Sequence, residues 1–242
     1  YPRLLPAERL QALAPLDRPG CCVPVATALA QTAAPDAVRA IVLTTIAGQP
    51  RYRLQEDGGG FVVVDALTGR RLPPVDEQAA LAGARAFLPG ADAVPVGRVH
   101  DDRWTHSGAL DAHRPLFKVQ MRDADATLLY LSSATGEVVM DAPAAQRAWN
   151  FVGAWLHWLY LLRDGSRDPV WSWTVIGLSA VGTVSALTGA LAGLWRWRFR
   201  GRYKSGARTP YRELPMRWHH VAGLAFGLAL IAWVFSGLMS MN

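Results

Sequence analysis

Two long runs of apolar residues lie in the last third of the chain. No charged residue occurs from Val170 to Trp195, and none occurs from Val221 to Met241. An α-helix rises about 1.5 Å per residue, so each run is long enough to cross a hydrocarbon core of roughly 30 Å. The pattern therefore predicts two transmembrane helices, at residues 169–197 and 216–242.

A third apolar run, residues 148–162, precedes these two and is shorter. As a helix it would be about 22 Å long, which is too short for a regular span. Its tryptophans are typical of the aromatic belt at a membrane interface. We therefore expect a short helix at residues 148–163 that dips into the outer leaflet, followed by a turn at residues 163–169.

Residues 1–147 show a different pattern, part of which occurs twice. The repeated pattern is a pair of strand-like segments followed by a Thr-Gly turn, at residues 50–55, 61–65 and 68–69 and again at 115–120, 128–132 and 135–136. An alanine-rich helical stretch precedes each copy, at Val23–Ala33 and at Glu77–Phe87. Alternation with a period of two between turn residues predicts antiparallel hairpins. The expected fold class is therefore an α+β domain of two helix-plus-antiparallel-meander repeats, joined to an α-helical transmembrane segment at residues 148–242.

Most of the positive charge lies between the two long apolar runs, in and beside the predicted loop 198–215. Against the single acid Glu213, the cations here are Arg196, Arg198, Arg200, Arg202, Lys204, Arg208, Arg212 and Arg217. The whole chain has a formal net charge of +6, so the remainder is nearly neutral and nucleic-acid binding is not indicated. A short basic loop of this kind stays in the cytoplasm. Residues 1–147 are then expected in the periplasm, a topology that calls for a helix upstream of Tyr1 and further helices downstream.

Two polar features of the predicted outer domain fit no specific template. An insert without a counterpart in the first repeat carries His100, His106 and His113 together with several aspartates. We expect a solvated polar loop there, with a metal site or a substrate-contacting loop as the alternatives. The adjacent Cys21 and Cys22 could form a bridge only with strain, so we expect two separate thiols, with a redox or metal role as the alternative.

Three further histidines lie within or beside the apolar runs. His157 lies in the short run, and His219 and His220 open the second long run. Ionisable side chains in membrane segments are functional candidates because they are costly to bury there. The alternative is a histidine that only forms hydrogen bonds between helices or contacts lipid headgroups.

The glycines that follow His219 suggest a use for it. Gly223 and Gly227 are spaced four residues apart and share its helix face, leaving a groove that a flat macrocycle could occupy. His220 is rotated about 100° from this face. Close packing between helices is the alternative use of such glycines.

These segments resemble known families. The repeats of residues 1–147 resemble the PepSY domain, whose copies end in a strand, a Thr-Gly turn and a final strand. The membrane segment is similar to the PepSY-associated transmembrane family. The similar motifs are Leu156-His157-Trp158-Leu159, Leu187-Thr188-Gly189-Ala190-Leu191 and Trp218-His219-His220-Val221-Ala222-Gly223. The resemblance covers essentially the whole chain.

The resemblance carries expectations about function. Members are iron-regulated proteins of the bacterial inner membrane, and some act as ferric-siderophore reductases that hold haem b between helix histidines. By this resemblance His157 would be a ligand of an outer haem, and His219 or His220 a ligand of an inner haem. The predicted helix between them is about 39 Å long, so one iron cannot bind both and two haems would be needed. Each would be completed by a histidine from a helix outside this chain.

The expected function is therefore transfer of electrons across the inner membrane to a periplasmic ferric siderophore or similar iron chelate. Bis-histidine ligation leaves no open iron position and favours electron transfer. The sequence contains neither a G-x-G-x-x-G nor a C-x-x-C motif, so the electrons would come from a separate cytoplasmic or membrane donor. The expected contacts include membrane lipid and no nucleic acid. The alternatives are a haem-free membrane-anchored module that binds a peptide, peptidase or partner protein, and a subunit of another respiratory or metal-handling complex.

Overall fold

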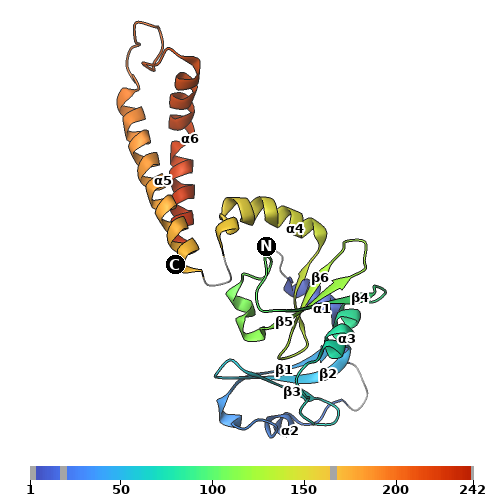
Figure 1. Ribbon diagram of the computed structural model, residues 1–242. Helices are drawn as coiled ribbons and strands as arrows, with labels where there is room; N and C mark the ends of the chain where they lie inside the picture. Colours follow the sequence, from blue (N-terminus) through green and yellow to red (C-terminus); the bar gives the residue numbers. More distant parts are fainter. Residues whose placement is uncertain (1–3, 17–20, 164–167, 241–242) are drawn as a thin grey trace. The chain divides into compact units, whose positions relative to one another are not determined.

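A computed structural model describes residues 4–16, 21–163 and 168–240. The chain forms two compact units (Figure 1). The first extends to His157, and the second comprises Trp158–Arg163 and the residues from Asp168 onward. Most of the predicted short membrane helix therefore groups with the sheet-containing unit, which differs from the boundary expected at residue 147.

The first repeat is a three-stranded antiparallel sheet in the order β1-β2-β3. Its elements are α2 (Val25–Leu29), a 3-10 turn (Pro35–Ala37), β1 (Val38–Ile46), β2 (Gln49–Glu56) and β3 (Phe61–Asp65), whereas α1 (Pro6–Ala12) precedes them and pairs through Arg9 with Glu137 of the second repeat. Leu54 pairs with Val62 and Tyr52 with Val64, which places four apolar side chains on one face. That face packs on Ala28 of α2. The helix is shorter than the predicted Val23–Ala33 because Pro24 lies at its N-cap and the chain leaves the helical path after Ala30.

The second repeat is a four-stranded antiparallel sheet in the order β4-β5-β6-β7, covered by one helix. Its elements are α3 (Glu77–Phe87), β4 (Ala93–Val99), a 3-10 segment (Gly108–His113), β5 (Leu116–Met121), β6 (Leu128–Ser132) and β7 (Val138–Ala142). The Asp76 side chain caps α3 by accepting a hydrogen bond from the amide of Ala79. The small side chains of Ala80 and Ala84 let α3 lie close to the apolar face of the sheet.

The same turn follows the hairpin in both repeats. Gly69 and Gly136 have φ of 71° and 76°, and each amide donates to the carbonyl four residues earlier, at 2.8 Å in both cases. A residue with a Cβ is strained at such angles, so glycine is required for the chain to turn here. At Gly69 a Cβ would also lie only 2.8 Å from Thr27 Cγ2 of α2. This shared turn is the arrangement that the sequence repeat predicts.

The chain leaves the second repeat through an interrupted helix. Residues of α4 (Ala144–Asn150) continue into a π-helical turn (Phe151–Leu156), and a 3-10 turn follows at Tyr160–Leu162. Between them Leu159 takes a left-handed conformation, with φ of 54°. The single short helix expected at residues 148–163 is thus divided into several segments. The expected turn at 163–169 lies largely outside the described residues.

The second unit contains two long antiparallel helices, α5 (Pro169–Arg196) and α6 (Leu214–Met239). Both are long and apolar enough to cross a membrane. Only 6% of each apolar window is buried within the protein, unlike the core helix of a soluble domain, which is mostly buried. The predicted helices at 169–197 and 216–242 coincide with these two helices, although residues 241–242 lie outside the described part of the chain.

Candidate functional site

His220 is buried where α5 and α6 meet the connecting loop. Its Nε2 lies 2.9 Å from the carbonyl oxygen of Gly193, and its Nδ1 lies 2.7 Å from Thr209 Oγ1. A carbonyl oxygen only accepts, so Nε2–H donates to Gly193, and in the neutral imidazole Nδ1 then accepts the Thr209 hydroxyl proton. Both nitrogens of the imidazole are therefore used within the protein, and neither is available to a metal in this arrangement.

The surroundings of His220 explain why it is held so closely. A Cβ at Gly193 would lie 3.1 Å from Leu224 Cδ2 and 3.5 Å from His220 Cδ2, so the glycine permits close approach of the helices. The rings of Trp197 and Tyr211 lie edge-on to the imidazole, at centroid distances of 5.8 and 5.3 Å. His220 thus joins both helices and the loop, which is a packing role.

The basic loop is folded against the helix end. The Arg198 amide donates to the carbonyl of Arg208 at 3.0 Å, and the Tyr203 hydroxyl donates to the carbonyl of Arg196 at 2.8 Å. The Arg198 guanidinium lies over the ring of Tyr203, 4.2 Å from its centroid. The positive charge of the basic loop consequently lies on a segment with a defined conformation.

His219, one residue earlier, has a different environment. It is exposed on α6, and a Cβ at Gly223 would meet no atom within 4 Å. Gly227 differs, because a Cβ there would lie 3.9 Å from Ala190 Cβ of α5. The expected groove is therefore open at Gly223, whereas Gly227 contributes to packing between the helices.

His157 ends the helical segment that contains the π-helical turn, and it is exposed. Two residues earlier, Trp155 points its indole toward the insert and donates from Nε1 to the carbonyl of Arg103 at 3.3 Å. The three histidines expected at the membrane therefore have distinct settings. His157 and His219 are exposed, and His220 is enclosed.

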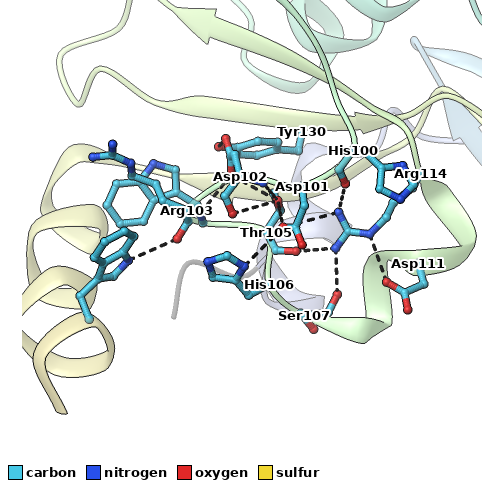
Figure 2. A network of polar contacts seen from close by, with 12 residues as sticks. His100, Asp101, Asp102, Arg103, Thr105, His106, Ser107, Asp111, Arg114 and Tyr130 are labelled. Atoms are coloured by element: carbon cyan, nitrogen blue, oxygen red, sulfur yellow. Dashed lines mark hydrogen bonds and ion pairs between the residues drawn. The ribbon is translucent and has the colours of Figure 1, made fainter. Parts of the chain in front are cut away.

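The insert between β4 and β5 forms a network of polar contacts (Figure 2). Asp102 Oδ2 accepts hydrogen bonds from Lys118 Nζ at 2.7 Å and from the Tyr130 hydroxyl at 2.8 Å. Burial alone would raise the pKa of Asp102, but the hydrogen bonds it accepts, that of Lys118 first, hold the pKa below its ordinary value. Burial and the charge of Asp102 raise the pKa of Tyr130, which therefore stays protonated and donates.

Arg114 holds the other half of the network. Its guanidinium donates to the carbonyls of His100, Thr105 and Ser107 and to the carboxylate of Asp111. The Arg114 side chain is only 4% exposed, so these acceptors replace water around a buried charge. Arg114 thereby joins backbone carbonyls of the insert to Asp111.

The expectation of a solvated polar loop holds only for part of this insert, because His100 and Arg103 are exposed whereas Thr105 and His106 are not. Thr105 is fully buried, and His106 is buried with its Nδ1 3.4 Å from Asp101 Oδ1. His113 stacks on Phe61 of the first repeat with a centroid distance of 4.9 Å, and burial lowers its pKa. The three histidines thus have separate partners or surroundings. Within the described residues no three His, Cys, Asp or Glu side chains are grouped as a metal site.

Cys21 and Cys22 also differ from expectation. We expected two separate thiols, and the structure joins the two residues in a disulfide.

A cavity of about 540 Å³ lies between the two repeats of the first unit. Its walls include Phe61 and Val63 of β3, Val75 before α3 and Thr135 in the second Thr-Gly turn. The exposed Arg71 contributes a positive charge at its edge. A cavity of this size with mostly apolar walls and few polar groups is typical of a small-ligand or peptide site.

Sequence reasoning missed the partners of His220 and the anchors of the insert. Nothing in the local sequence marks Gly193 or Thr209 as a partner of His220. When the chain is compared with protein-family models, curated proteins and solved structures, no match is found.

Proposed function

We propose that this chain is part of a bacterial inner-membrane haem protein that passes electrons outward to a ferric siderophore or similar chelate. The observation that supports this most is the contrast between two adjacent histidines. His220 uses both ring nitrogens within the protein, whereas His219 is exposed on α6 beside the open space at Gly223. An exposed imidazole one turn from the open position at Gly223 would suit a histidine that holds the iron of a flat haem.

In this proposal His219 would hold an inner haem and His157 an outer one, each through one imidazole. Haem with two axial histidines supplies one-electron transfer without an open iron position. The contribution of the protein is to hold these two imidazoles. His220 fixes the contact of α6 with α5 and thereby the direction in which His219 points, and the exposed apolar side chains of both helices face lipid.

The basic loop determines the expected orientation of the protein in the membrane and thereby the direction of electron transfer. Its cations favour the cytoplasm, so His219 would lie near the inner surface and the sheet-containing unit outside. One electron delivered to the chelate converts Fe(III) to Fe(II), which hard oxygen ligands hold less tightly. The electron would enter from a cytoplasmic or membrane donor.

The absorption spectrum of the protein purified from membranes tests the proposal. We expect a Soret band and, after dithionite reduction, the bands of b-type haem. A protein that stays colourless when produced with ample haem would contradict the proposal.

The cavity between the repeats favours a second candidate, a haem-free membrane-anchored module that binds a peptide. Its apolar walls come from both repeats, and Arg71 could meet a peptide carboxylate. Under this alternative the protein is colourless and binds a peptide, and Ala82→Trp, which fills the cavity, abolishes the binding. A coloured protein that binds no peptide would exclude this second candidate.

A further inference from the structure

The insert between β4 and β5 is braced where it approaches the π-helical turn. Asp102 accepts from Lys118 of β5 and Tyr130 of β6, and its second carboxylate oxygen accepts from the amide of Trp104 at 2.9 Å. This ties the tip of the insert, Arg103 and Trp104, to two central strands. The tip is therefore a fixed surface of the domain.

The π-helical turn rests on this tip through Trp155. The indole Nε1 donates to the carbonyl of Arg103 at 3.3 Å, and the Arg103 guanidinium lies 5.6 Å from the centre of the Trp155 ring. The rings of Trp104 and Trp155 lie 6.5 Å apart in a tilted arrangement, and Phe151 stacks on Trp155 at 5.9 Å. Contacts of these kinds hold the indole in one orientation.

A fixed Trp155 constrains the residues that follow it. A π-helical turn is rare, and it occurs mostly as a single turn within an α-helix, frequently at functional sites. His157 follows Trp155 by two positions and ends the same helical segment. The direction of its imidazole therefore depends on whether the turn stays π-helical.

We infer that the Arg103–Trp104 tip and Trp155 form a bracket that positions His157. The inference rests on the proposed role of His157 as an axial ligand, and the bracket residues act through His157 without touching the bound group. The insert connects the sheet to the ligand-bearing turn.

Two variants of the full chain test the bracket. Trp155→Phe keeps an aromatic ring and removes the hydrogen bond to Arg103, whereas Trp104→Ala removes the facing ring. Trp149→Phe is the matched control, because Trp149 lies on the preceding turn of α4 and is 76% exposed. Circular dichroism and gel filtration in detergent show whether each variant is folded.

The first readout needs no haem. Carbethoxylation of His157 by diethyl pyrocarbonate, measured by peptide mass spectrometry on haem-depleted protein, is expected to change at least threefold in rate in both bracket variants. His219 in the same samples and His157 in the control should keep the wild-type rate. A wild-type His157 rate in both folded bracket variants overturns the inference.

The second readout uses the haem-loaded protein. Electron paramagnetic resonance of the outer low-spin haem should shift in both bracket variants while the inner signal stays unchanged. An unshifted outer signal in a variant whose His157 reactivity has changed also overturns the inference. If the wild type binds no haem, the proposed function fails, and the carbethoxylation rates still decide whether the bracket positions His157.

Discussion

Replacing His220 by phenylalanine separates a packing role from a ligand role. Phenylalanine preserves the ring that contacts Trp197 and Tyr211 and removes the hydrogen bonds to Gly193 and Thr209. In membrane proteins such interhelical hydrogen bonds contribute about 0.6 kcal/mol each on average and up to about 1.7 kcal/mol. We therefore expect the free energy of unfolding to fall by about 1–3 kcal/mol.

Haem content and stability are measured on the same preparation of His220→Phe. Unfolding in mixed micelles with increasing dodecyl sulfate reports the free energy, and the pyridine haemochrome assay reports haem per polypeptide. Phe226→Leu is the control, since Phe226 is 70% exposed on the same helix. We expect His220→Phe to have a lower free energy of unfolding than the wild type and the same haem content. Wild-type stability with the loss of one haem would show that His220 is a ligand and would refute the assignment.

Three further predictions concern the topology, the repeats and the insert. Ser107→Cys in intact cells should react with an impermeant thiol reagent and Ser205→Cys should not, because the basic loop favours the cytoplasm. Labelling of Ser205→Cys and not of Ser107→Cys would show the opposite orientation in the membrane. Gly69→Ala and Gly136→Ala should each lower stability by about 1–2 kcal/mol because both φ values are positive, with the larger loss at Gly69, where the added Cβ also meets α2; thermal melts check the order. The pKa of Asp102 is lower in the folded protein than its ordinary value of 3.8, so the ionised carboxylate stabilises the fold at pH values above 3.8, and this stabilisation is lost as the pH falls through the pKa of the folded protein. Asp102→Asn should therefore make the free energy of unfolding fall less steeply at acid pH, and an unchanged pH dependence argues against the network.

The long helices could be read from the sequence because a membrane segment needs only length and the absence of charge. The repeat was also readable, since a left-handed turn requires glycine and the Thr-Gly pair marks Gly69 and Gly136. These features are local, and each depends on a short stretch of chain.

The polar contacts could not be predicted, because their partners are distant in sequence. Lys118 and Tyr130 lie 16 and 28 positions from Asp102, and only their approach in the sheet turns a hydrophilic segment into a partly buried network. The division of the short helix has the same origin, since Trp155 meets a carbonyl 52 positions away. Likewise, His219 and His220 are adjacent residues of the same type, and the hydrogen bond of His220 to Gly193 on the facing helix distinguishes them.

The proposed electron transfer through the protein can be measured across a sealed membrane. The purified protein is reconstituted into vesicles that contain dithionite, and a ferric hydroxamate chelate is added outside with an impermeant Fe(II) indicator. We expect indicator colour with the wild type and none with His157→Ala or His219→Ala, while His220→Phe remains active. A wild-type rate equal to that of protein-free vesicles would contradict the proposed electron transfer.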